Sequence, residues 1–233
     1  MFIKKVLKKI FHFSLFILFN KIKRITQREK VVSPLPENIL VKGWSEKYNL
    51  ILIHNPKAAG TSLMNILEIP MFFNHQYPLR KYTIDYWESN RFLLVVRHPL
   101  DRLVSAYFYH TGDKYFGGYL KLFPNLKSLS FYEYFKSFAG VEHTITPQYN
   151  YAYRPGSEKK IDFLLKFESL EEDLKNQLGI ESKLPKKNQT IRVKKPILSS
   201  KELNIILAYY NIDFEMFGYP LDDFHLYIEV RDE

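Results

Sequence analysis

A lysine, a glycine and two hydroxyl residues follow one short apolar run. Residues 50–53 read LILI and are followed by Lys57, Gly60, Thr61 and Ser62. An apolar run without alternation is typical of a strand buried on both faces, and the apolar periodicity after the loop is typical of a helix. In a strand–loop–helix turn the backbone amides converge on one point, where a phosphate or sulfate binds. The segment therefore predicts an anion site at which Gly60 permits close approach.

Two side-chain types could complete this site. Thr61 and Ser62 can cap the helix or donate their hydroxyls to the anion, and Lys57 brings an ammonium beside it. The order of residues disfavours an ATP loop, because a Walker A motif places its lysine after the last glycine, and Lys57 comes before Gly60. The alternative interpretation is that Pro56 and Gly60 only make a turn and Lys57 is a solvated charge.

A second apolar run ends in a cluster of arginines. Residues 91–97 read RFLLVVR, and Pro99 and Asp101 suit the first turn of a helix that begins directly afterwards. Arg97 should therefore lie at the carboxyl edge of a buried strand, where ligands of open α/β sheets collect. Arg102 and Ser105 are three residues apart and share a helix face, so they can converge on a second anion. For Arg102 a structural salt bridge is an equal alternative.

These segments resemble the motifs of sulfotransferases. Residues 56–62 resemble the loop that binds a 5′-phosphosulfate, and the pattern R-x-P-x-x-R-x-x-S-x-Y at residues 97–107 resembles the 3′-phosphate motif. HTITPQ at 143–148, FESLEED at 167–173 and YNIDFEMFGY at 210–219 resemble further elements of the family 2 carbohydrate sulfotransferases. The resemblance covers residues 49–219.

The resemblance implies an enzyme that uses 3′-phosphoadenosine 5′-phosphosulfate (PAPS) as sulfuryl donor and needs no metal. Lys57 would assist the leaving group, and His75, which lies between the two motifs, would be the catalytic base. Several residues would hold the donor: Lys57, Ala59, Gly60, Thr61 and Ser62 at the 5′-phosphosulfate, and Arg97 and Ser105 at the 3′-phosphate.

The resemblance also suggests where the acceptor binds and where this chain departs from the family. His143 and Gln148 are candidates for the acceptor site, with His143 the second choice as base. The acceptor is expected to be a carbohydrate or glycolipid. His98 stands where relatives often carry Asp or Asn, and the chain has no cysteine. The lack of cysteine excludes disulfides and thiolate metal sites and suits a bacterial-type cytoplasmic enzyme.

The expected fold is α/β, with a P-loop-like parallel sheet flanked by helices. Residues 161–167 predict a third buried strand. Three segments have the spacing of a capping box, with serine followed three residues later by glutamate. They begin at Ser130, Ser169 and Ser199.

The positive charge is concentrated in the first 30 residues. The whole chain carries a formal charge of +9, and residues 1–30 contain nine Lys or Arg and one Glu. The nearly neutral remainder argues against a nucleic-acid partner. Residues 2–25 have an apolar stripe at helical spacing but too short an apolar run to span a bilayer, so residues 1–30 are predicted to be an amphipathic arm on a membrane surface.

Two alternatives to a membrane-surface arm remain. One is a signal peptide, although no small-x-small cleavage site follows, and the other is a helix packed on the protein's own body. Residues 31–45 are expected to be a linker and residues 46–233 the sulfotransferase domain. The expected location is the cytoplasmic side of a membrane or the cytoplasm.

Two other function classes remain as alternatives at this stage. A P-loop-type kinase would use ATP and Mg²⁺, and the position of Lys57 counts against it. A membrane-bound binding module without turnover would have no need for a base or for a leaving-group lysine.

Overall fold

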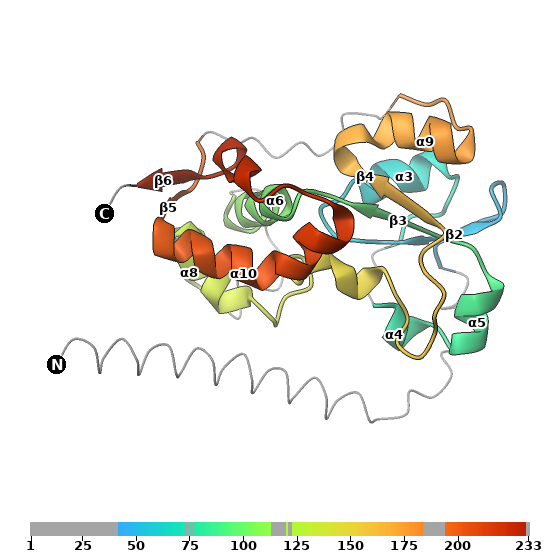
Figure 1. Cartoon of the computed structure of the whole chain (residues 1–233), viewed down its shortest axis with the longest axis horizontal. Coiled ribbons are helices and arrows are strands. Elements are labelled where there is room, and N and C mark those ends of the chain that lie inside the picture. Colours follow the sequence, from blue (N-terminus) through green and yellow to red (C-terminus); the bar gives the residue numbers. More distant parts are fainter. Residues whose placement is uncertain are drawn as a thin grey trace. The chain divides into compact units, whose positions relative to one another are not determined.

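Four strands form the central sheet. The computed structural model describes residues 42–72, 75, 77–112, 120, 123–183 and 194–231. The strands are β1 (Trp44–Ser45), β2 (Leu50–Ile53), β3 (Phe92–Val96) and β4 (Phe163–Lys166), in the order β1-β2-β3-β4 (Figure 1). β2, β3 and β4 run parallel, and β1 is antiparallel to β2. The predicted α/β fold with a parallel sheet is confirmed.

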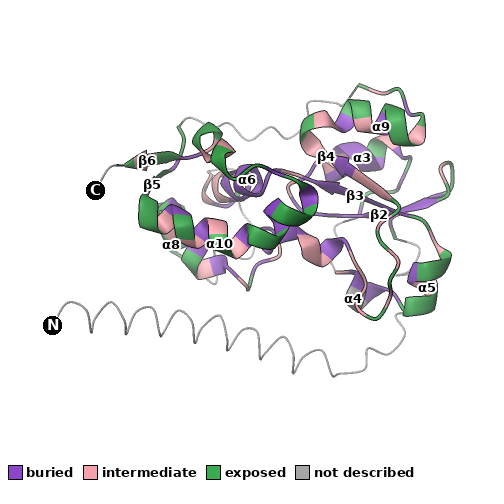
Figure 2. Ribbon diagram, in the orientation of Figure 1, coloured by how far each residue is buried: buried purple, intermediate pink, exposed green. Residues whose placement is uncertain are grey.

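The two inner strands are buried on both faces, as their unalternating apolar runs predict. In β2, Leu50 and Leu52 belong to one core cluster, and Ile51 and Ile53 belong to the other. All four side chains are at most 3% exposed. Side chains of successive strand residues point to opposite faces, so a strand covered on both sides must be apolar at every position. Figure 2 shows the buried strands between the helices.

Helices cover both faces of the sheet. On one face α3 (Gly60–Ile66) and α9 (Leu170–Leu178) pack against Leu50 and Leu52. The larger core on the other face includes side chains of α6, α8 and α10. The remaining helical bounds are α4 (Pro78–Lys81), α5 (Ile84–Ser89), α6 (Pro99–Thr111), η1 (Leu126–Ser128), α8 (Phe131–Phe138), η2 (Gln148–Tyr151), η3 (Phe167–Ser169), α10 (Ser200–Phe217) and η4 (Asp222–Leu226).

The third predicted strand is present, but the prediction that it is buried is wrong. β4 lies at the edge of the four-stranded sheet, and of its four residues only Leu165 is buried. Residues 161–167 contain enough apolar side chains to suggest an inner strand. An edge strand differs from an inner one in its neighbours, which local sequence does not specify.

Two of the three predicted capping boxes are confirmed. Ser130 and Ser199 each accept a hydrogen bond from the backbone N–H three residues later, and the glutamate at that position accepts one in return. The predicted box at Ser169 is wrong. Ser169 makes no side-chain cap bond, and its Oγ instead donates to Asp173 Oδ2 at 3.1 Å. The same carboxylate oxygen accepts from the Lys166 N–H at 2.7 Å, so it joins β4 to α9.

Short strands were not predicted from the sequence. β1 falls in the last two residues of the predicted linker and pairs with β2, so those two residues belong to the sheet. β5 (Ile197–Ser199) and β6 (Glu229–Arg231) form a separate parallel pair. A strand of two or three residues is too short to show a hydrophobic period.

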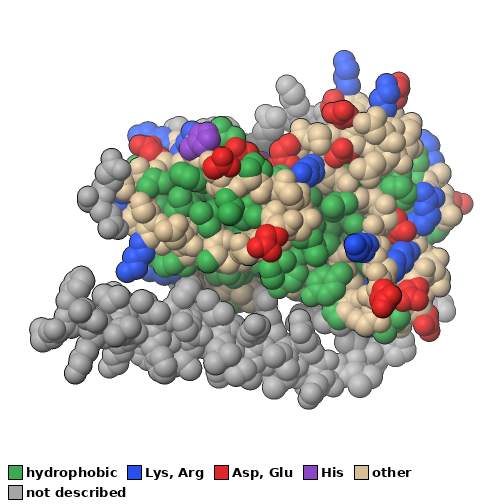
Figure 3. Space-filling model, in the orientation of Figure 1, with side chains coloured by type: hydrophobic (Ala, Val, Ile, Leu, Met, Phe, Trp, Pro, Cys, Tyr) green, Lys and Arg blue, Asp and Glu red, His purple; other side chains and the backbone are tan. Residues whose placement is uncertain are grey.

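The predicted arm at residues 1–30 lies outside the described residues, so its membrane role stays a prediction. Within the described ranges, no helix is both long and apolar enough to cross a bilayer. Basic and acidic side chains are interspersed on the face that Figure 3 shows. That distribution is in keeping with the expectation of a nearly neutral body.

Candidate active site

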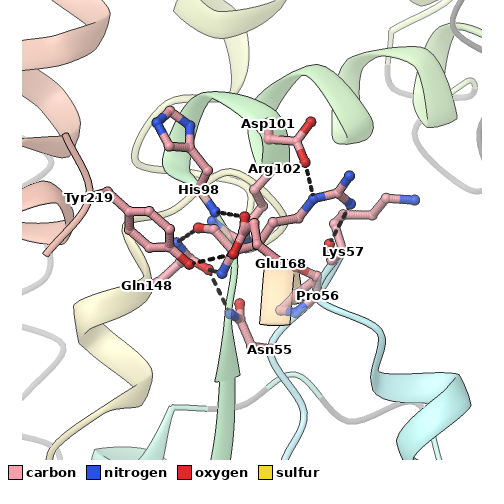
Figure 4. Close-up of polar contacts among 10 residues, drawn as sticks. Asn55, Pro56, Lys57, His98, Asp101, Arg102, Gln148, Glu168 and Tyr219 are labelled. Carbon is pink, nitrogen blue, oxygen red and sulfur yellow. Dashed lines mark hydrogen bonds and ion pairs between the residues drawn. The ribbon is translucent and has the colours of Figure 1, made fainter. Parts of the chain in front are cut away.

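Three loops meet at the carboxyl edge of the parallel strands. The loop after β2 contains Asn55, the loop after β3 begins with Arg97, and the segment after β4 contains Glu168. The Asn55 side chain donates from Nδ2 to the Val95 carbonyl at 2.8 Å, which ties the loop after β2 to the end of β3. The His98 N–H donates to Glu168 Oε1 at 2.7 Å, which ties the loop after β3 to the one after β4 (Figure 4).

Gln148 fastens the first two loops together. Its side chain is fully buried, and Oε1 accepts from Asn55 Nδ2 at 2.9 Å and from the Arg97 N–H at 3.0 Å. Its Nε2 donates to the Arg97 carbonyl at 2.7 Å. Its own N–H donates to Asp213 Oδ2 at 2.7 Å, which connects it to α10. In this structure the Gln148 amide positions the two loops, and the contact with the acceptor that the resemblance implies for Gln148 stays a prediction.

The loop after β2 has an unusual backbone. Lys57 and Ala59 have φ angles of 65° and 58°, values that are uncommon for residues with a side chain. Non-glycine residues in this region are strained, and such strain concentrates at ligand-binding sites. Left-handed residues alternating with ordinary ones turn successive N–H groups toward one concave side, which is an anion-binding arrangement. Residues 57–60 therefore have a backbone of the kind that binds anions.

The small and hydroxyl residues of the loop lie at the start of α3. The N-cap of α3 is Ala59, so Thr61 and Ser62 do not cap the helix. They lie in its first turn, and their donation to an anion stays a prediction. Gly60 was expected to allow close approach by the anion. The His54 ring packs against Gly60, with Cδ2 and Nε2 2.2 Å from where a Cβ would be, and close approach by an anion stays a prediction.

Arg97 holds the loop after β2 from the side of β3. Its Nη1 donates to the Lys57 carbonyl at 3.0 Å, its Nε pairs with Asp101 Oδ2 at 2.6 Å, and its guanidinium stacks over the Phe167 ring at 4.2 Å. The side chains of Arg97 and Asp101 are 12% and 9% exposed. Ser105 lies two turns into α6 and is buried. Their contact with a 3′-phosphate remains a prediction.

Arg102 is structural, but it does not make the salt bridge considered from the sequence. Its side chain is fully buried, and each hydrogen bond goes to a backbone carbonyl. Nε donates to Pro56 at 2.9 Å, Nη1 to Thr146 at 2.9 Å and Nη2 to His143 at 3.0 Å. The prediction that Arg102 converges with Ser105 on a second anion is therefore wrong. The guanidinium fork instead joins the loop after β2 to the segment that carries His143.

The ammonium of Lys57 lies over an aromatic ring. Nζ is 4.0 Å from the centre of the Tyr109 ring, and that ring is 48% exposed. A cation over the face of a tyrosine is attracted by the ring's negative face. Lys57 is thus held at its carbonyl by Arg97 and at its ammonium by Tyr109.

Three histidines lie in a row beside this loop. The His75 ring centre is 4.3 Å from that of His54 and 5.4 Å from that of His143. His75 Nδ1 is 3.2 Å from the His54 carbonyl oxygen. A carbonyl only accepts, so this bond places the proton on Nδ1 and leaves Nε2 as the basic nitrogen. The Tyr151 hydroxyl lies 3.3 Å from the His75 carbonyl oxygen and 3.4 Å from that of His143, so its single proton is shared between the two segments.

Burial keeps two of these histidines neutral. It lowers the pKa of His75, against the weaker opposing effect of the hydrogen bond to the His54 carbonyl. It lowers the pKa of His54 to about 3, with a smaller contribution from His75. His143 has a side chain that is 44% exposed, and its Nε2 is 3.8 Å from Glu142 Oε1. His75 is therefore in the form that accepts a proton at neutral pH.

The departure at His98 is accommodated by aromatic packing. The imidazole is 1% exposed, stacks on Tyr227 at 4.3 Å, and meets Tyr219 edge-on at 5.3 Å. The Tyr219 hydroxyl donates to Glu168 Oε2 at 2.9 Å. Glu168 thus accepts from two segments far apart in sequence, a role that the sequence alone did not suggest. In the sequence, the pattern F-E-x-L at residues 167–170 was the one feature that could have pointed to Glu168.

Among the described residues, no cluster of three or more histidine, cysteine, aspartate or glutamate side chains is placed to hold a metal ion. The site that these loops form is built of backbone amides, hydroxyls, cations and neutral imidazoles. Such groups bind an anion and accept a proton, which is what a group transfer from an anionic donor requires.

Comparison with known proteins identifies the family. Neither the curated protein sequences nor the solved structures give a match to this chain. The family model described as the sulfotransferase family matches residues 44–220, which include every loop of the site described above. The chain belongs to the sulfotransferase family and its chemistry is sulfuryl transfer.

Proposed function

We propose that this sulfotransferase moves a sulfuryl group from PAPS to a hydroxyl of a carbohydrate or glycolipid. The observation that carries the proposal is the junction of the loops after β2 and β3. Arg97 donates to the Lys57 carbonyl and Arg102 to the Pro56 carbonyl, so the two predicted phosphate-binding segments are fixed to each other. A donor with one phosphate at each end of a nucleoside needs two such segments at a fixed distance.

The residues present suit this donor. PAPS supplies an activated sulfuryl group and two anionic ends. The strained loop at residues 57–60 and the hydroxyls of Thr61 and Ser62 would hold the phosphosulfate, and Arg97 and Ser105 would hold the 3′-phosphate. Arg97 is also tied to Asp101, so a guanidinium in a fixed orientation is presented.

Each reacting step has a candidate side chain. The acceptor oxygen would attack the sulfur while the sulfur–oxygen bond to the phosphate breaks, and the hydroxyl proton would go to Nε2 of His75. Lys57 would stabilise the negative charge that develops on the departing phosphate oxygen, since a positioned cation acts most strongly where charge appears in the transition state. His75 suits the base role because its Nδ1–H is fixed by the His54 carbonyl.

The acceptor class rests on the resemblance to carbohydrate sulfotransferases and on the predicted membrane arm. A sugar offers hydroxyls at many positions, and aromatic rings such as the half-exposed Tyr109 beside Lys57 can stack on it. Association of residues 1–30 with a membrane surface would place glycolipid acceptors within reach, and we propose the cytoplasmic side of a membrane as the location.

The proposal is tested by transfer of ³⁵S from labelled PAPS to a panel of glycans and glycolipids. We expect transfer by the parent and at least a hundredfold slower transfer by His75→Ala, a typical contribution of a general base being 10²–10⁴-fold. Because burial lowers the pKa of His75, the parent rate should rise with pH through a midpoint below the ordinary histidine value. Active His75→Ala together with inactive His143→Ala would move the base to His143.

A further inference from the structure

One buried histidine lies between the donor loop and the proposed base. His54 is the last residue before Asn55 in the loop after β2, and its side chain is 8% exposed. On one side its ring packs against Gly60, where an added Cβ would be 2.2 Å from Cδ2 and Nε2. Its ring centre is also 4.3 Å from that of His75. The ring also meets the Phe72 ring edge-on, with 5.6 Å between the ring centres.

We propose that His54 is a positioning residue whose ring acts as a spacer between the start of α3 and the imidazole of His75. The inference rests on the proposed function, since it concerns how the base is placed against the loop that would hold the phosphosulfate. His54 itself is assigned no proton transfer. Its ring sets the separation of the two groups, and its carbonyl fixes the proton on Nδ1 of His75.

The ring acts through its shape rather than through charge. Burial keeps it neutral against the opposing effect of its hydrogen bond with the Phe72 backbone, and its Nδ1 is buried without a hydrogen-bond partner among the described atoms. A phenylalanine ring has a similar shape and avoids the burial of an unpaired nitrogen, but it lacks the hydrogen bond with the Phe72 backbone. A phenylalanine at this position should therefore preserve the spacing, whereas an alanine would leave a gap beside His75 and Gly60 into which water can enter.

Gly60 provides an independent way to move the ring. Its φ is not in the left-handed region, so the backbone itself tolerates a side chain there. The obstacle is the His54 ring, because real Cβ atoms essentially never lie 2.2 Å from another heavy atom. Gly60→Ala must therefore displace the ring and so change its contact with His75. Removing the ring with His54→Ala makes room for the new methyl group.

The decisive experiment is a double-mutant cycle on His54 and Gly60, read by transfer kinetics and by NMR. We expect His54→Ala to lower kcat about ten- to a hundredfold with little change in KM for PAPS, because a misplacement of about 1 Å costs on that order. His54→Phe should recover most of the loss. Gly60→Ala should be harmful in the parent but have a much smaller further effect in His54→Ala. His225→Ala, in an exposed histidine of η4, is the matched control and should behave as the parent.

The NMR readout needs no transferase activity. The His75 ring resonance is followed against pH, with its assignment taken from His75→Ala. Because burial is the main cause of the low pKa of His75, water entering the gap in His54→Ala should raise that pKa toward its ordinary value. In His54→Phe it should stay at the parent value. If His54→Ala does not fold, the same comparison is made with His54→Ser.

The two readouts separate the inference from the proposed function. If the parent transfers no sulfuryl group but the His75 pKa moves as described, the proposed function fails and the spacer role stands. An unchanged His75 pKa in the Ala or Ser variant, or an equal effect of Gly60→Ala in both backgrounds, would overturn the spacer role whatever the activity.

Discussion

Replacement of Arg102 by lysine should unfold the site while conserving its charge. The guanidinium donates to the carbonyls of Pro56, Thr146 and His143, which belong to two separate loops. A lysine has its donors on a single nitrogen and lacks the planar fork, so it cannot reach carbonyls on different sides together. We take two of the three bonds as lost.

The expected cost follows from that loss. A hydrogen bond involving a charged group contributes about 1.5–3 kcal/mol, so the loss of two costs about 3–6 kcal/mol. That is a large part of the roughly 5–15 kcal/mol by which a domain is stable. Urea denaturation followed by circular dichroism measures the change, with Arg91→Lys as the control because Arg91 is exposed. Equal stability of Arg102→Lys and the parent would refute the view that this residue holds the two loops together.

Three further predictions concern the lysine, the buried histidines and the arm. Lys57→Ala should lose most turnover but retain measurable affinity for 3′-phosphoadenosine 5′-phosphate (PAP), and unchanged turnover would disprove its role at the leaving group. His54 and His110, whose pKa values are lowered to about 3 and about 4, bind protons in the unfolded chain below about pH 6.5 but not in the folded one. The free energy of unfolding should therefore fall from pH 7 to pH 5, and it should fall less in His54→Phe. Asp213, whose pKa is raised to about 6, acts in the opposite direction in both proteins. An equal fall in the parent and the variant would contradict the role of His54 in this pH dependence. Deletion of residues 1–30 should leave a soluble, folded transferase that no longer sediments with anionic vesicles, and an insoluble or unfolded product would indicate that the arm packs on the body.

Local sequence patterns predicted those parts of the fold that depend on neighbours along the chain. The runs at residues 50–53 and 92–96 are apolar at every position because both faces are covered, and such runs have few alternative structures. The serine–glutamate pairs at Ser130 and Ser199 close over a single turn, so their geometry is specified by spacing alone. At Ser169 the same spacing failed because Asp173 offers the hydroxyl a carboxylate that also binds β4.

The site was predicted less completely because its contacts are long-range. The segments that carry Lys57, His75 and Arg97 could be chosen from motif and order. The partners that hold them could not, since Gln148 and Glu168 are 51 and 70 residues away from the backbone groups that they bind. Arg102 has the same motif position whether it binds a ligand or three carbonyls, and only its burial decides between the two.

Isothermal titration of the full-length protein with PAP, and separately with ATP and Mg²⁺, tests the central claim most directly. The loops after β2 and β3 are fixed to each other by Arg97 and Arg102, and we assign one phosphate of the donor to each loop. We therefore predict that PAP binds without added metal and more tightly than ATP with Mg²⁺. Binding of ATP with Mg²⁺ in preference to PAP would contradict the assignment of PAPS as donor.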